Sequence, residues 1–108
     1  MHAIKRVEII IDYLESPRLL ERIQKEDMDI GYTVVKEVVG SGRRGERMGD
    51  GLSGEMTNSY ILIACSEDQA ARIIEIVRPV LKRFGGICLV SDAIGCNLSA
   101  SSHAFPPG

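Results

Sequence analysis

Apolar residues recur at every second position near the start of the chain. In residues 5–13, Val7, Ile9 and Ile11 share one parity, and β-branched residues dominate the segment. This alternation predicts a β-strand with one face against a core. Ile10 has the opposite parity, so we expect the other face of the strand to be partly covered as well.

Two later segments show the spacing of helices. Ser16-Pro17 supplies a capping hydroxyl and a proline at the first helical position, and the short apolar face that follows should end near residues 27–29. Residues 66–69 form a Ser-x-x-Gln capping box, which predicts a second helix that the glycines at 85–86 terminate. The apolar residues with helical spacing in this second helix are Ala70, Ile73, Ile74, Val77, Val80, Leu81 and Phe84.

Three further apolar runs predict strands at residues 31–39, 58–65 and 87–91. The resulting order, βαββαβ, is that of the α+β ferredoxin-like fold, with one antiparallel sheet and two helices on one of its faces. The other sheet face stays bare, and a bare apolar face predicts oligomerisation. We expect that face to carry Ile10, either Tyr32 or Thr33, and one parity of the third strand.

Six of the eleven glycines fall between Gly40 and Gly54. A loop of this length without its own secondary structure is usually functional or disordered. Its arginines, Arg43, Arg44 and Arg47, carry guanidinium groups that suit phosphate or carboxylate. We expect the loop, residues 40–57, to bind an anionic ligand, a partner protein or both. The alternative is a solvated hinge, because acidic residues in the same stretch balance the arginines.

The start of this loop matches Gly-x-Gly-x-x-Gly, but it does not open a helix. A dinucleotide site needs the pyrophosphate at a helix N-terminus, and no helical period follows residues 40–45. A Walker A loop also fails, because no Gly-Lys-Ser/Thr follows. No nucleophile lies beside a base, and Cys96 and His103 lack further metal ligands nearby, so we expect neither an enzyme nor a metal site.

The totals restrict the class of protein. The 108 residues suffice for one domain, placed at 1–95, with a mobile tail at 96–108. A net charge of −2 and the absence of a long apolar run argue against nucleic-acid binding and membrane insertion. Three cysteines and no recognisable signal peptide lead us to expect a reducing cytoplasm, with Cys65 and Cys88 as small buried hydrophobes.

The chain resembles the PII signalling superfamily over residues 5–92. The resemblance rests on Gly-Tyr-Thr-Val at 31–34, the Gly-x-Gly-x-Arg-x-x-Arg pattern at 40–47, the second helix at the expected distance, and the glycines at 85–86. The first two motifs are most similar to PII-like proteins of inorganic-carbon metabolism, which include a bicarbonate-transporter regulator and a carboxysome-associated group. The resemblance implies a trimer that binds adenine nucleotides between subunits and signals to a partner through the long loop.

Departures from the nitrogen-sensing members bear on the ligand. Those members place Gln where this chain has Arg44, carry basic residues around the last strand, and often have a modifiable loop Tyr; this chain has none of these features. The resemblance therefore implies ADP or AMP rather than ATP, with bicarbonate as a candidate second effector. The implied nucleotide-binding residues are Gly31, Thr33, Gly40, Ser41, Gly42, Arg43, Arg44, Arg47, Phe84, Gly85 and Gly86.

The expected function is that of a non-enzymatic, homotrimeric regulator of inorganic-carbon uptake or fixation. Its partner would be a bicarbonate transporter or a carboxysome-linked protein. Two alternatives stay open: a nitrogen-regulatory PII protein, and a scaffold trimer whose loop docks a partner without any ligand.

Overall fold

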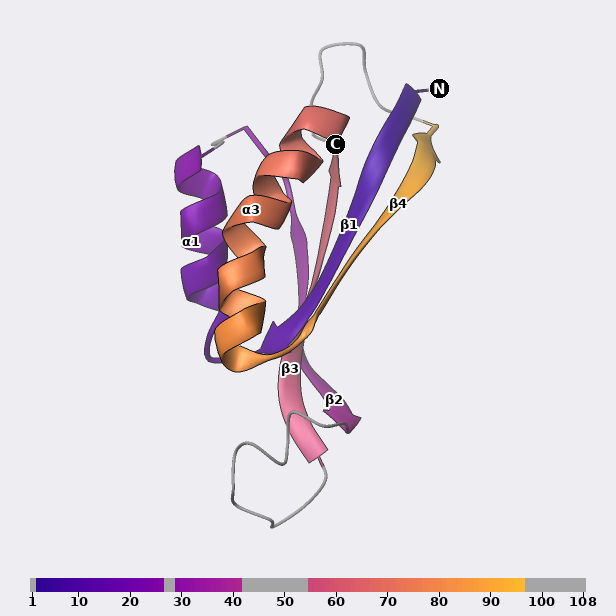
Figure 1. Cartoon of the computed structure of the whole chain (residues 1–108). Coiled ribbons are helices and arrows are strands. Elements are labelled where there is room, and N and C mark those ends of the chain that lie inside the picture. The colour runs from indigo at the N-terminus through magenta and orange to yellow at the C-terminus, as the bar shows by residue number, and fades with distance from the viewer. Residues whose placement is uncertain (1, 27–28, 42–54, 97–108) are drawn as a thin grey trace.

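Six elements follow one another in the computed structural model, which describes residues 2–26, 29–41 and 55–96. Their order along the chain confirms the βαββαβ prediction (Figure 1). The elements are β1 (His2–Asp12), α1 (Ser16–Glu26), β2 (Thr33–Ser41), β3 (Glu55–Cys65), α3 (Glu67–Phe84) and β4 (Ile87–Gly95).

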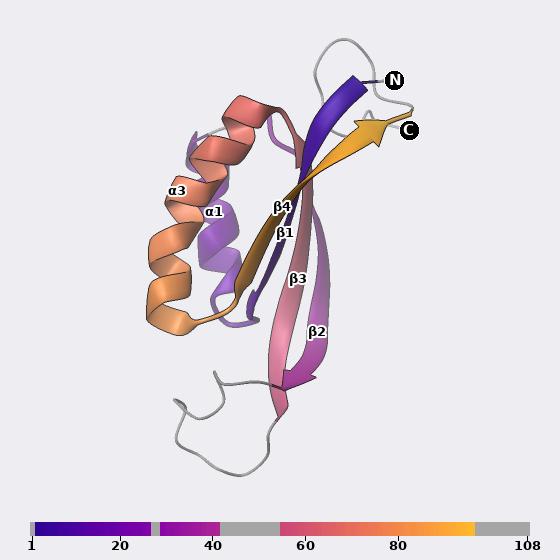
Figure 2. The ribbon, with the colours of Figure 1, turned by 45° about the vertical axis from the view of Figure 1, so that its right-hand side comes forward.

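The strands form one antiparallel sheet in the order β2-β3-β1-β4. Both helices lie on the same face of this sheet, so the molecule has two layers, as Figure 2 shows nearly edge-on. This arrangement confirms the ferredoxin-like fold. It also places β2 and β4 at the two edges of the sheet, where β2 pairs with β3 and β4 pairs with β1.

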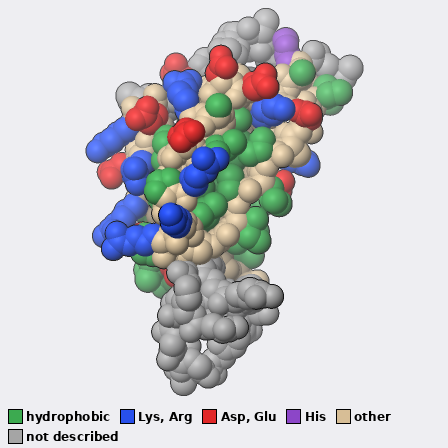
Figure 3. Space-filling model, viewed as in Figure 1, with side chains coloured by type: hydrophobic (Ala, Val, Ile, Leu, Met, Phe, Trp, Pro, Cys, Tyr) green, Lys and Arg blue, Asp and Glu red, His purple; other side chains and the backbone are tan. Residues whose placement is uncertain are grey.

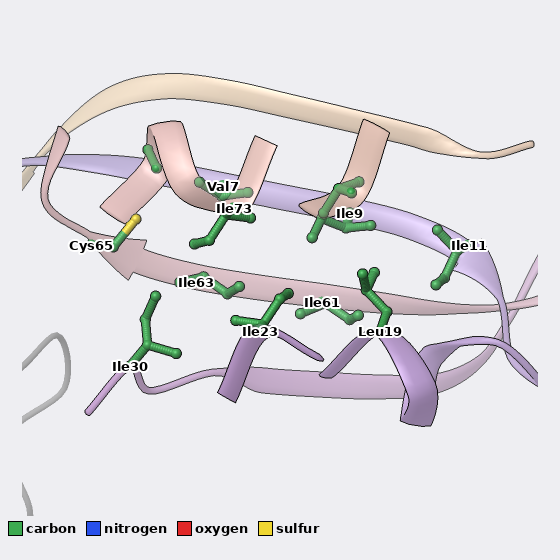
Figure 4. Packing of buried hydrophobic residues seen from close by; sticks show 12 residues of the cluster. Val7, Ile9, Ile11, Leu19, Ile23, Ile30, Ile61, Ile63, Cys65 and Ile73 are labelled. Carbon is green, nitrogen blue, oxygen red and sulfur yellow. The ribbon is translucent and has the colours of Figure 1, made fainter. Parts of the chain in front are cut away.

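The core lies between the sheet and the helices. Side chains of one parity in β1 and β3 meet the apolar faces of α1 and α3 (Figure 4). Aliphatic residues dominate the core. The fully buried members include Val7, Ile9, Ile11, Leu19, Ile23, Ile61, Ile63, Ile73 and Val77.

Both ends of α3 are capped. The Ser66 hydroxyl accepts from the Gln69 backbone N–H at 3.1 Å, and the Gln69 side chain accepts from the Ser66 N–H at 2.9 Å. These bonds satisfy two donors that would otherwise be unpaired at the helix start. At the other end the Gly85 N–H donates to the Leu81 carbonyl at 2.7 Å.

The strands around the glycine-rich loop extend further than predicted, because β2 continues to Ser41 and β3 begins at Glu55, within the range of 40–57 expected for the loop. Gly40 pairs with Met56 and Ser41 with Glu55, which makes both loop ends part of a hairpin. The central part of the loop, 42–54, and the tail, 97–108, lie outside the described residues. β1 and β4 are also longer than expected, because they pair up to His2 and Gly95.

A bulge interrupts β2 between Val35 and Val38. Val35 pairs with Tyr60 and Val38 with Asn58, so two residues of β2, Lys36 and Glu37, lie opposite a single residue of β3. Glu37 has φ of 59°, in the left-handed region that side chains other than glycine rarely adopt. The sequence showed Lys36 and Glu37 only as a polar break in a run of valines.

The sheet face away from the helices carries apolar side chains, as predicted. Register places Val35, Ile87 and Leu89 on this open face with Ile10 and Thr33. Val35, Ile87 and Leu89 are about half exposed, at 49%, 51% and 55%. This surface is called the open sheet face below.

Candidate functional site

The described members of the implied nucleotide-binding set fall into two groups. Gly31 lies two residues before β2, Thr33 begins this strand, and Gly40 and Ser41 end it. The second group is the turn of residues 84–86, which connects α3 to β4. Gly42, Arg43, Arg44 and Arg47 belong to the part of the loop outside the described residues.

The first group belongs to the edge strand β2, and the second leads into β4, the opposite edge strand. β3 and β1 separate β2 from β4. Three strand spacings of about 4.8 Å place the two edges roughly 14 Å apart. One copy of the chain therefore does not bring its two groups together, although the β2 edge of one copy could meet the β4 edge of another.

Gly86 is required by close backbone packing. Its φ is 122°, and a Cβ built on it would lie 2.5 Å from the Ile10 carbonyl oxygen and 3.0 Å from Leu81 Cδ2. No side chain fits at that distance without movement of β1. Sequence reasoning assigned this glycine to the ligand and missed its packing role, because the approach of β1 depends on the sheet order.

Phe84 and Gly85 terminate α3. Gly85 has φ of 82°, which suits a glycine at the end of a helix. The Phe84 ring is partly buried, and the Arg83 guanidinium carbon lies 5.2 Å from the ring centroid. This distance allows a cation–π contact that orients the last turn of the helix.

A polar network crosses the open sheet face and was not predicted. The Tyr60 hydroxyl donates to Glu8 Oε2 at 2.7 Å, and Glu8 Oε1 lies 3.5 Å from Arg6 Nε. Arg6 Nε also donates to Ser91 Oγ at 3.2 Å, so the network joins β3, β1 and β4. The bond to the Glu8 carboxylate is the main cause that raises the pKa of Tyr60 above its ordinary value.

Cysteine burial differs in part from expectation. Cys65 is buried in the core, as predicted, and Cys96 is exposed. Cys88 was expected to be buried but is only half-buried, because it lies on the edge strand β4. Partial burial raises the pKa of its thiol. Within residues 2–26, 29–41 and 55–96, no three metal-ligating side chains cluster.

The same described segments contain no helix that has both the length and the apolar character to span a lipid bilayer.

The sequence profile of one family, "Nitrogen regulatory protein P-II", matches residues 4–98. Comparison with the curated proteins yields no match.

Several solved structures share this fold. CPII from Thiomonas intermedia K12, a nitrogen regulatory PII-like protein bound to ADP, AMP and bicarbonate, superposes with a TM-score of 0.67 at 20% identity, covering 85% of this chain and 87% of CPII. A Thermus thermophilus protein described as PII-like gives 0.63 at 26% identity, with coverages of 84% and 87%. CutA1 from Oryza sativa gives 0.65 at 14% identity, with coverages of 88% and 83%.

Proposed function

The chain belongs to the nitrogen regulatory protein P-II family, and on this premise we propose that it is a trimeric signalling protein that binds an adenine nucleotide between its subunits. Proteins of this family are trimers. The open sheet face supports the same assembly here, since Val35, Ile87 and Leu89 are apolar and half exposed in one copy.

The observation that carries this proposal is the separation of the two groups of candidate residues. Residues 31–41 lead into and form the edge strand β2, whereas residues 84–86 lead into β4 at the opposite edge. An interface between the β2 edge of one copy and the β4 edge of the next would bring a group from each into one cleft. A repeated contact of this kind, between two different surfaces, closes into a ring when the rotation permits.

ADP or AMP is the proposed ligand, with bicarbonate as a second effector. CPII structures have been solved with ADP, AMP and bicarbonate. The chemistry of this chain supports the smaller nucleotides, because Ile87 follows the glycines at 85–86 and no basic residue lies there or along β4 to contact a third phosphate. The loop arginines would hold the phosphates that are present.

The proposed output is regulation of a partner protein in inorganic-carbon uptake or fixation, through the loop between β2 and β3. The protein would act in the cytoplasm and without catalysis. The described residues support the signalling role, because both loop ends belong to a paired hairpin. A change in the loop would therefore act directly on the edge strand β2.

Isothermal titration calorimetry tests the ligand. We expect ADP and AMP to bind more tightly than ATP, and 2-oxoglutarate to have little effect. Arg44→Ala should weaken nucleotide binding about tenfold or more, since a charge-assisted contact contributes roughly 1.5–3 kcal/mol. Lys25→Ala, which removes a positive charge from the last turn of α1, is the control and should bind normally.

Two outcomes would replace the proposal. Unchanged affinity in the Arg44→Ala, Arg47→Ala variant would favour the ligand-independent scaffold. Tight binding of Mg·ATP that 2-oxoglutarate strengthens would favour a nitrogen-regulatory protein.

A further inference from the structure

A groove lies between the two helices on the outer surface of the molecule. It has a volume of about 280 Å³ and is lined by residues of the turn before α1, of α1 itself and of the last turns of α3. Among its lining residues are Arg18, Arg22, Arg83, Glu15, Pro79 and Phe84. This volume is close to the lower limit for ligand pockets, so it suits a small ligand.

Three arginines from two helices converge on this groove. Arg18 and Arg22 are four residues apart, so they lie one turn apart on the same side of α1. Arg83 faces them from the last turn of α3. Figure 3 shows Lys and Arg side chains gathered over the lower left of the helix layer, whereas acidic side chains gather toward its upper end.

In the part of the chain that the structure describes, the two arginines that α1 contributes to the groove are not neutralised by ion pairs. Among the described residues, Arg18 and Arg22 form no ion pair, and neither does Glu15, the acidic residue in the lining. Two guanidinium groups of α1 therefore retain their donors for a ligand. This local excess contrasts with the net charge of −2 for the whole chain.

Besides Arg83, the α3 wall of the groove is apolar. Pro79, Val80 and Phe84 line it, and the Phe84 ring lies against the Arg83 guanidinium group. An apolar wall lowers the local dielectric constant and strengthens the attraction between an anion and the guanidinium groups. The aromatic contact also restricts Arg83, so less conformational entropy is lost when it binds.

We propose that this groove is a binding site for a phosphate group, separate from the nucleotide site at the sheet edges. A phosphate carries a charge near −2 and at least three acceptor oxygens, which suit the two guanidinium groups of α1, with Arg83 in the same lining. A carboxylate carries a single charge, so it would balance only one of the two guanidinium charges of α1. Either inorganic phosphate or the phosphate of a small organic ester supplies this chemistry.

The two α1 arginines separate this site from the proposed nucleotide site. Phe84 is one of the implied nucleotide-binding residues, but that set includes no residue of α1. A variant that changes only Arg18 and Arg22 therefore tests the groove without changing an assigned nucleotide contact. Both arginines are exposed, so their replacement should leave the core intact.

The experiment is an NMR titration of the full chain with sodium phosphate, with ribose 5-phosphate, and with acetate, at constant ionic strength. We expect the arginine Nε–H signals of Arg18 and Arg22 to shift and saturate with a phosphate-bearing probe, and acetate to have little effect. Comparison of the two phosphate probes identifies the source: a stronger effect of ribose 5-phosphate indicates an ester, and equal effects indicate the free ion.

Two double variants make the test specific. Arg18→Ala, Arg22→Ala should bind phosphate at least about tenfold more weakly, because two charge-assisted contacts are lost. The Lys25→Ala, Lys82→Ala variant also removes two positive charges, from residues in the last turns of the helices that do not line the groove. It should bind phosphate almost normally. Glu15→Gln should strengthen binding a few-fold, because it removes the one carboxylate in the lining.

Three results would overturn the proposal. Shifts that do not saturate would show that no site exists, and equal weakening in both double variants would show general electrostatic attraction. Equal binding of acetate and phosphate would remove the assignment to phosphate. Because none of these measurements uses a nucleotide, failure here leaves the proposed nucleotide function untouched.

Discussion

At Gly86 the backbone of the α3–β4 turn comes so close to β1 that a methyl group does not fit. The Cβ of an alanine would lie 2.5 Å from the Ile10 carbonyl oxygen, and φ of 122° is strained for any side chain. Gly86→Ala should lower the free energy of unfolding by about 1–3 kcal/mol. Urea denaturation followed by circular dichroism measures this loss.

The matched control for that variant is Gly95→Ala. Gly95 ends β4 and does not have a positive φ, so the change should stay within about 0.5 kcal/mol. Equal stability of the Gly86→Ala variant and the unmodified protein would show that the turn moves freely away from β1.

Tyr60 and Glu8 predict a pH dependence at the alkaline end. Hydrogen bonding to the Glu8 carboxylate raises the pKa of Tyr60. A raised folded-state pKa means that this bond stabilises the protein fully below the unfolded value of about 10, and the effect is lost as the pH rises through the raised pKa. Glu8→Gln should lower the pKa of Tyr60, measured from its ring NMR signals.

Glu21→Gln serves as the comparison for Tyr60. Glu21 is an exposed residue of α1, away from the open sheet face, so its replacement should leave the Tyr60 titration unchanged. An unchanged titration in Glu8→Gln would contradict the role of the carboxylate.

Among the elements, β2 contains the clearest departure from regular geometry. Glu37 adopts φ of 59° inside the bulge, a conformation that costs a non-glycine residue about 1–2 kcal/mol. Glu37→Gly should therefore raise stability, by up to about 1 kcal/mol after the added flexibility of the unfolded chain is subtracted. Thermal unfolding gives this difference.

Lys36→Gly controls for the added flexibility, because Lys36 shares the bulge but does not have a positive φ. It should destabilise the protein by about 0.5–1 kcal/mol. If both glycine variants lose stability equally, Glu37 is not strained.

Local patterns predicted the elements well, and long-range contacts explain what they missed. The capping box at Ser66, the proline after Ser16 and the parity of β1 depend on neighbours in sequence, and the structure has each element where they indicated. The full length of β1 and β4 depends on their mutual pairing, and the packing role of Gly86 depends on which strand lies beside β4. The periodicity of one sequence predicts neither the strand lengths nor the packing of Gly86.

The sequence allowed candidate site residues to be named, but not their positions relative to one another. Gly31, Gly40 and the glycines at 85–86 could be singled out from the sequence, yet only the sheet order shows that they occupy opposite edges. The groove between the helices was missed altogether. Arg18 and Arg22 resemble ordinary solvated charges until Arg83 is seen to face them across the same pocket.

For the whole molecule, the open sheet face predicts the oligomeric state. Multi-angle light scattering should give about three times the chain mass of 11.8 kDa. Leu89→Asp should dissociate the assembly, because Leu89 is half exposed on the open sheet face and pairs with Glu8 in register. A charge placed there would be buried without a partner.

Leu14→Asp is the matched control. Leu14 is more exposed than Leu89, at 67%, but lies in the turn before α1 and not on the sheet. Its replacement should leave the mass unchanged. A Leu89→Asp variant that keeps the full mass would place the interface elsewhere.

The opposite positions of β2 and β4 connect ligand affinity to protein concentration. If each site takes one half from the β2 edge of one copy and the other half from the β4 edge of the next, a lone copy has two half-sites and no complete one. A closed ring has as many sites as members, and opening it at one contact removes one site. By mass action, dilution should then weaken ligand binding, and ligand should oppose dissociation.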